Sequence, residues 1–147
     1  MSSFRNHSLF LLSINRFCYD VGRVISKKYN LSVNERNTLI VLSNLDINSV
    51  KELSDYLSIS NTNTSKVLSS LEKKNLILRI LDKKDKRFIQ LLLTEKGKLI
   101  SQNVIEEISN LLRNRILQFP DPIGKKIQSL LNEYDARIIY KSNSINH

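Results

Sequence analysis

The chain has 147 residues, 41% of them hydrophobic and 25% charged, so a single compact domain with a sizeable core is expected and wholesale disorder is excluded. Only three glycines and two prolines exclude collagen-like and proline-rich classes, and a single cysteine excludes an internal disulfide. Its 23 lysines and arginines against 14 acidic residues leave a net charge of +9, which indicates a polyanionic partner such as nucleic acid or an anionic membrane surface, or else only a solvated surface.

Apolar residues recur at helical spacing along most of the chain, and the first amphipathic helix is expected over about Ser8–Lys28. Two capping boxes follow, in which a serine precedes a glutamate by three residues and predicts the start of a helix. The first predicts a helix from Val33 to about Leu45. The apolar stripe of the first helix consists of Phe10, Ile14, Phe17, Val21 and Val24. The two capping boxes are Ser32 with Glu35 and Ser49 with Glu52.

Ser60 predicts the start of a further helix, which should end near Lys74, because Asn75 tolerates the left-handed conformation. Its inward stripe has helical spacing and consists of Thr64, Val67, Leu68 and Leu71. Its outward face carries small polar groups and one cation, namely Asn61, Thr62, Asn63, Ser65, Lys66 and Ser69.

Two β-prone runs, Ile77–Leu81 and Phe88–Leu93, flank the charged residues 82–87, which predicts a β-hairpin with a cationic tip. The segment 66–98 contains ten cations and four anions, so it supplies +6 of the net +9. The positive charge is therefore concentrated on the polar helix and the hairpin that follows it.

Thr94 is expected to cap a long helix that ends near Leu117. Pro120 breaks that helix, and Asp121 as N-cap with Pro122 in the first turn should start the last one. The last helix should carry a near-heptad stripe, followed by a polar tail: Ile123, Ile127, Leu130, Tyr134 and Ile138, then Ser142 to His147.

Two short helices joined by a tight turn, the second one polar and cationic on its outer face, predict a helix-turn-helix. A helix fits the major groove of B-DNA, where asparagine pairs with adenine while serine, threonine and lysine reach phosphates or base edges. The six outward residues of that helix are therefore expected to face the major groove. The basic hairpin would add an arginine to the neighbouring minor groove and lysines to phosphates.

The stretch 50–97 resembles the MarR-type (multiple antibiotic resistance regulator) winged helix-turn-helix proteins. The resemblance implies a mainly α (α+β) fold with a two-stranded β-hairpin wing, in which the N- and C-terminal helices form a dimerisation bundle. It rests on Glu52-Leu53 and Leu57, Leu71-Glu72-Lys73-Lys74, the wing residues Asp82, Asp85, Lys86 and Arg87, and Leu93-Thr94-Glu95-Lys96-Gly97.

By this resemblance Asp85 orients the wing and Arg87 enters the minor groove, and we expect Lys83, Lys84 and Lys86 on phosphates. Residues 1–147 would form a single MarR-like domain, with a winged helix-turn-helix lobe at 32–97. Dimerisation helices at 1–31 and 118–147 and a linking helix at 98–117 would complete it. The family also implies a small, often aromatic or lipophilic effector between the dimer helices and the lobes.

The apolar stripes of the end helices exceed what a small motif can cover, so they independently predict a homodimer, with a monomeric core as the alternative. A two-fold dimer presents two recognition helices about 34 Å apart, so its operator should be pseudo-palindromic.

The expected function is sequence-specific regulation of transcription on double-stranded DNA, as a repressor that a small ligand releases. The alternatives are a non-specific architectural or protein-interaction winged-helix module, and a redox-sensing regulator.

The redox alternative rests on Cys18, because some members of the family sense oxidants through a cysteine in the first helix. Cys18 lies in mid-helix beside Arg16, and an inert, partly buried thiol is the favoured interpretation. No cofactor, metal site, enzymatic activity or membrane contact is expected, and the protein is placed in the cytoplasm. His7 and His147 lie at opposite ends, and no phosphate loop or nucleophile motif is present.

We predict that Arg87→Ala weakens operator binding by about 1 to 3 kcal/mol, because it removes a minor-groove contact. Lys84→Ala should mainly lower the dependence of affinity on salt, because it removes a phosphate contact. Titration of labelled operator at several salt concentrations measures both. Equal affinity of both variants and the wild type would contradict the assignment.

Overall fold

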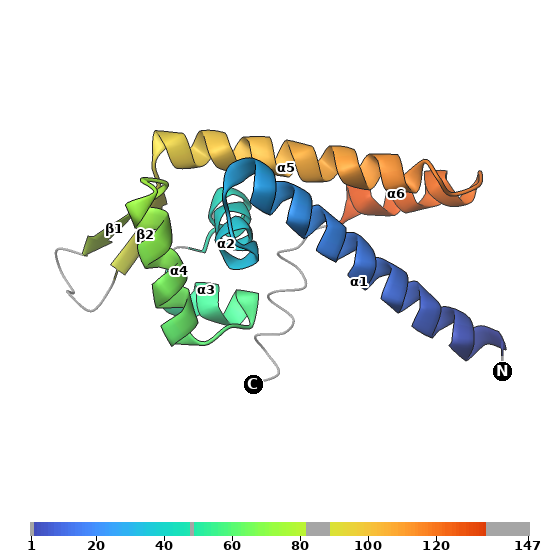
Figure 1. Ribbon diagram of the computed structural model, residues 1–147, viewed down its shortest axis with the longest axis horizontal. Coiled ribbons are helices and arrows are strands. Elements are labelled where there is room, and N and C mark those ends of the chain that lie inside the picture. The colour runs from blue at the N-terminus through green and yellow to red at the C-terminus, as the bar shows by residue number, and fades with distance from the viewer. Residues whose placement is uncertain (1, 48, 82–88, 135–147) are drawn as a thin grey trace.

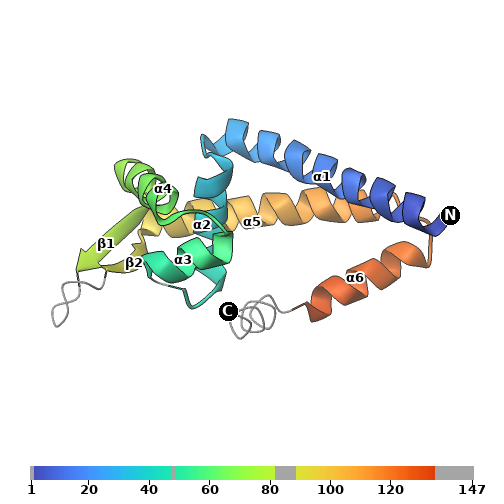
Figure 2. The ribbon, with the colours of Figure 1, turned by 90° about the horizontal axis from the view of Figure 1, so that it is seen from below.

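The computed structural model describes residues 2–47, 49–81 and 89–134. A winged lobe, made of α2, α3, α4 and the hairpin, occupies one end, and α1 and α5 extend away from it (Figure 1). At the far end the chain turns back into α6, which runs at an angle to α5 in the direction of the lobe (Figure 2). The elements are α1 (Ser2–Tyr29), α2 (Val33–Asn44), α3 (Val50–Leu57), α4 (Asn61–Lys73), β1 (Ile77–Leu81), β2 (Ile89–Leu93), α5 (Glu95–Ile116) and α6 (Ile123–Glu133).

The winged lobe closes around one apolar core to which each of its elements contributes. α2 packs against α5, α4 and β2, and α3 packs against α4. Removing each large aliphatic side chain from water contributes about 2 kcal/mol, which holds these short elements together. The side chains with at most 3% exposure that form this core include Leu39, Leu53, Leu68, Leu71, Ile77 and Leu91.

Side-chain caps set the starts of α2, α3, α4 and α5 where the sequence predicts them. Ser32 and Glu35 form the reciprocal capping box of α2, and Ser60 and Thr94 cap α4 and α5. The Ser49 hydroxyl also caps α3, because it accepts from the Glu52 amide. In this cap the Glu52 carboxylate accepts from the Ser49 hydroxyl. Ser58 at the end of α3 and Asn75 after α4 both adopt left-handed φ, 52° and 58°, a conformation in which glycine is the most common residue.

The end helices differ from the prediction in detail. α1 begins at Ser2 instead of Ser8, since no glycine or proline interrupts the residues between. Val24 is 41% exposed and Ile25 is fully buried instead, because Ile25 lies one helical turn after buried Val21. Of the other residues of the expected stripe, Phe17 is partly buried and packs against the core, whereas Phe10 and Ile14 are exposed in the single chain.

The start of α6 also differs from the prediction. Asp121 is not its N-cap: Pro122 occupies that position without a side-chain hydrogen bond. The Asp121 carboxylate lies instead 3.3 Å from Lys125 Nζ, one turn into the helix. α6 ends at Glu133, and the expected stripe residue Ile138 and the polar tail lie outside the described residues.

The motif Leu-Thr-Glu-Lys-Gly forms the corner between the wing and α5. Thr94 Oγ1 accepts from the Gly97 amide and donates to the Asn75 carbonyl, both at 2.9 Å. Gly97 permits the backbone of Leu76 to pass very close, because a Cβ at Gly97 would lie 1.9 Å from the Leu76 carbonyl oxygen. The corner therefore packs α5 directly on the turn that follows α4.

We predict that Gly97→Ala destabilises the protein by about 3 kcal/mol or more, because backbone must move to admit the methyl group. Gly22→Ala is the matched control, since a Cβ there meets nothing closer than 3.5 Å and alanine favours a helix. Urea denaturation measures both free energies of unfolding. Equal stability of the two variants would show that the corner relaxes freely.

Candidate nucleic-acid interface

α4 presents one buried and one exposed side. Thr64, Leu68 and Leu71 are fully buried, as the sequence predicts. A hydrogen bond of 2.8 Å joins the Thr64 hydroxyl to the buried Ser54 hydroxyl of α3, so the polar group on the buried side has a partner. The two helices of the motif are thus locked together, and the opposite side of α4 is left to solvent.

The exposed side of α4 carries the residues expected at the major groove. Asn61, Thr62, Asn63, Ser65 and Lys66 are exposed, and Ser69 is half-buried. A depression of about 580 Å³ follows this side, and Asn63 does not line it. The residues that line it are Thr62, Ser65, Lys66, Ser69, Ser70 and Lys73.

Two residues of this depression were not among the predicted contacts. Lys73 is exposed and Ser70 is half-buried. The spacing of Thr62, Lys66, Ser69 and Lys73, by four, three and four, marks one helical stripe and could have identified Lys73 from the sequence. Lys73 adds a second cation to the exposed side of α4.

An arginine of the wing holds the other edge of α4. Arg79 of β1 donates from Nε to Glu72 Oε2 at 2.7 Å, and its Nη2 donates to Ser69 Oγ, also at 2.7 Å. The contact between Nη2 and Glu72 Oε2 is 2.6 Å. Glu72 and Ser69 lie on α4, so this cluster fixes the wing relative to that helix.

A second groove, of about 710 Å³, lies between α3, α4 and the wing. Asn61, Ser65 and Arg79 line it together with acidic Glu52 and Asp55 of α3. α4 therefore separates a groove with acidic and basic walls from a depression whose charged members are lysines.

The wing is an antiparallel pair in which Ile77 faces Leu93 and Leu81 faces Ile89. This pairing confirms the predicted hairpin. The predicted wing contacts, Lys83, Lys84, Asp85, Lys86 and Arg87, lie outside the described residues.

The remaining candidate, Cys18, is exposed on α1, not partly buried. On the neighbouring helix α2, burial lowers the pKa of Arg36. In the described part of the chain no three metal-ligating side chains gather, and no helix there has the length and apolarity to cross a membrane.

Comparison with known proteins shows the family. Residues 21–104 match the family described as Transcriptional regulator SarA/Rot. The chain is also 32% identical to the HTH-type transcriptional regulator SarZ of Staphylococcus epidermidis over 106 residues, which cover 72% of this chain and 71% of the relative. The chain belongs to the SarA/Rot family of transcriptional regulators. The membership confirms the predicted function class, a regulator of transcription and not an enzyme.

Solved structures show the same fold as this SarA/Rot-family chain. A MarR family protein from Bacillus stearothermophilus superposes with a TM-score of 0.75 at 23% identity, over 89% of this chain and 91% of that one. MepR of Staphylococcus aureus in a complex with DNA gives a TM-score of 0.67 at 18% identity, over 86% and 93%. The predicted MarR-type winged helix-turn-helix is therefore confirmed.

We predict that Arg79→Gln lowers stability by about 1 kcal/mol, because it removes the charge that joins β1 to α4. Lys98→Gln is the control: its pair with Glu95 is exposed on both sides, 55% and 89%, and its loss should change stability by less than about 0.5 kcal/mol. Urea denaturation at moderate salt compares them. An unchanged Arg79→Gln would mean that the wing does not depend on this cluster.

Proposed function

We propose that this regulator binds double-stranded DNA sequence-specifically as a homodimer, with α4 in the major groove and the wing in the adjacent minor groove. The observation that carries the proposal is the exposed polar and cationic side of α4, a helix whose opposite side is buried in the core. Asn61, Thr62, Ser65 and Lys66 would contact bases and phosphates, and Lys73 joins them from the same stripe. Arg87 would enter the minor groove, with Lys83, Lys84 and Lys86 on phosphates and Asp85 orienting the wing.

The homodimer is supported by apolar surface at the end of the molecule away from the winged lobe. A cavity of about 440 Å³ between α1, α5 and α6 is lined by apolar groups such as Phe10, Ile14 and Ile127. Such a surface calls for a second subunit. Large hydrophobic side chains that are at least 40% exposed there are Leu9, Phe10, Leu11, Leu12, Ile14, Leu117, Phe119, Ile123, Leu130 and Leu131.

A dimer through these helices would set the spacing of the two α4 helices and so favour a pseudo-palindromic operator. Repression by occupancy, and release by a small effector, complete the proposal. An effector would have to bind one spacing of the two lobes more tightly than the other, because equal binding shifts no equilibrium. The site of action is the cytoplasm, which in bacteria such as the staphylococcal relatives contains the chromosome.

Selection of random duplexes on the purified chain, combined with analytical ultracentrifugation, tests the proposal. We expect a dimer and recovered sequences with dyad symmetry whose half-sites lie about one helical turn apart. Recovery of no preferred sequence would favour the non-specific architectural alternative, and a monomer would contradict the docking arrangement.

We predict that Lys66→Ala lowers affinity for the recovered duplex and reduces the slope of log affinity against log salt by about 1.8, because each of the two subunits loses one phosphate contact worth about 0.9. Lys125→Ala removes the same charge from exposed α6, at the opposite end, and should leave the slope unchanged. Fluorescence anisotropy at several salt concentrations gives both slopes. Identical slopes for the two variants would remove Lys66 from the interface.

A further inference from the structure

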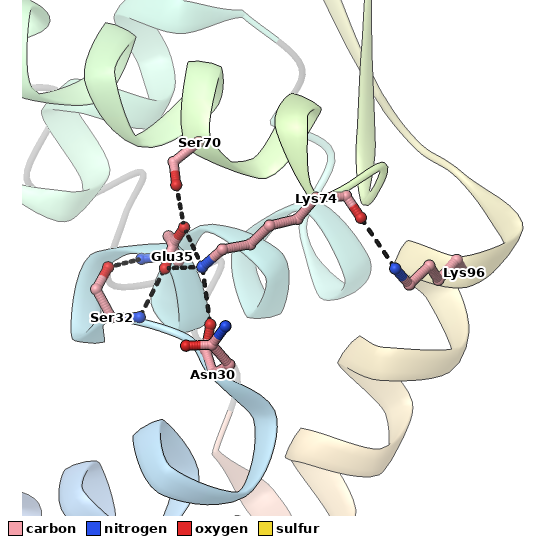
Figure 3. Close-up of polar contacts among 6 residues, drawn as sticks. All are labelled: Asn30, Ser32, Glu35, Ser70, Lys74 and Lys96. Atoms are coloured by element: carbon pink, nitrogen blue, oxygen red, sulfur yellow. Dashed lines mark hydrogen bonds and ion pairs between the residues drawn. The ribbon is translucent and has the colours of Figure 1, made fainter.

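A buried carboxylate lies between α4 and the helices that lead to the proposed dimer interface. Glu35, in the first turn of α2, is only 4% exposed, although glutamate is rarely buried unless it is paired. It forms the centre of a polar cluster that we call the Glu35 junction (Figure 3). Its members are Asn30, Ser32, Glu35, Ser70, Lys74 and Lys96.

Each of the two carboxylate oxygens of Glu35 has two hydrogen-bond or ion-pair contacts. Oε1 accepts from Ser70 Oγ at 2.6 Å and lies 2.8 Å from Lys74 Nζ. Oε2 accepts from the Ser32 amide at 2.6 Å and from Lys74 Nζ at 2.9 Å. Four contacts fill the acceptor positions of a carboxylate, and an amide in its place would set a donor against a donor in either orientation.

The second charged member, Lys74, connects more elements. It follows the last residue of α4, and its Nζ also donates to the Asn30 carbonyl at the end of α1, at 2.8 Å. The ammonium therefore lies between the carboxyl end of α1 and a carboxylate at the amino end of α2, and both helix ends favour these charges. The Lys74 carbonyl in turn accepts from Lys96 Nζ of α5 at 3.0 Å.

These contacts join α4 to α1, α2 and α5 at one point. The partners are distant in sequence: Glu35 is separated from Ser70 by 35 residues and from Lys74 by 39. They involve the carboxyl-terminal part of α4, opposite the end where Asn61 and Thr62 begin the helix. The junction can therefore fix the angle at which the exposed side of α4 is presented.

We propose that Glu35 is a positioning residue for DNA binding, which acts through Lys74 and Ser70 to hold α4 at a fixed orientation relative to α1 and α5. This inference rests on the proposed function. A fixed angle matters most for a dimer on a pseudo-palindrome, because both copies of α4 must enter their grooves together.

Electrostatics alone gives the opposite expectation for one variant, which makes the test sharp. Glu35→Gln removes a negative charge, so it should strengthen DNA binding if charge alone decides. The junction requires weaker binding to the selected duplex, on the order of tenfold. Lys74→Met changes the charge in the other direction, and the junction again requires weaker binding.

The controls are Glu95→Gln and Lys98→Met, which make the same charge changes in an exposed ion pair at the start of α5. Their affinities should follow charge, slightly tighter for Glu95→Gln and slightly weaker for Lys98→Met. The probes are a fluorescein-labelled duplex recovered by selection and a shuffled duplex of equal length. Glu35→Gln should lose affinity for the selected duplex and keep or gain it on the shuffled one.

Stability against pH gives a second readout. Burial alone would raise the pKa of Glu35, but the hydrogen bonds from Lys74, Ser70 and the Ser32 amide outweigh it, and the pKa lies below its ordinary value. The carboxylate faces one charged group, its partner Lys74 of α4. A second, Lys96 of α5, donates to the Lys74 carbonyl. The stabilisation is therefore present above the unfolded pKa of about 4.3 and is lost as pH falls through the folded pKa. The difference in free energy of unfolding between the wild type and Glu35→Gln should therefore shrink as pH falls, because the wild-type carboxylate then becomes neutral as well.

The outcomes separate the two proposals. If folded Glu35→Gln, checked by circular dichroism, binds the selected duplex as tightly as the wild type or tighter, the positioning role is overturned. If Glu35→Gln does not fold, Glu35→Asp replaces it, and an unchanged affinity of that shorter carboxylate overturns the role as well. If the wild type itself does not distinguish the selected from the shuffled duplex, the proposed function fails, and this inference fails with it.

Discussion

α4 must expose one row of polar side chains to water while contacts with neighbouring elements fix the position of the helix. A helix of thirteen residues with one apolar stripe gains little stability by itself, so its orientation depends on its neighbours. Leu68 and Leu71 supply the apolar part of that support, but apolar packing is not directional. Direction comes from polar contacts, which are satisfied at only one geometry.

Three such contacts reach α4 from three sides. The hydroxyls of Ser54 and Thr64 join it to α3, Arg79 joins it to the wing, and Glu35 joins it to the corner between α1 and α2. Each involves a different level of exposure, from a fully buried hydroxyl pair to the partly exposed ion pair of Arg79. Loss of the buried contacts should cost more than loss of the exposed one, because an unpartnered polar group is left without water.

Much of this architecture could be predicted from the sequence, since it depends on local chemistry. The caps at Ser32, Ser60 and Thr94 and the left-handed Asn75 each involve neighbours within a few residues. The outward residues of α4 follow from helical periodicity in the same way. The two strands of the hairpin also form within the predicted runs, because their β-branched and aliphatic residues favour extended backbone.

The support of the site could not be predicted in this way. The sequence indicates Glu35 only as half of a capping box, and no nearby residue indicates that it also binds Ser70 and Lys74 at the far end of α4. Arg79 reaches Glu72 across a turn, and its role depends on how β1 leaves α4. The start of α6 also differs from the sequence prediction: Pro122 takes the N-cap position, and Asp121 pairs with Lys125 one turn ahead.

The close approach of Gly97 to Leu76 packs the first turn of α5 directly on the turn that leads into β1. α5 has 22 residues, so it acts as a lever about 33 Å long between the far end of the molecule and the wing. A tilt of about 5° at the far end would displace the base of the wing by about 3 Å. In the proposed dimer, a small adjustment at the interface between subunits would therefore be magnified at the hairpin if α5 moves as a straight rod.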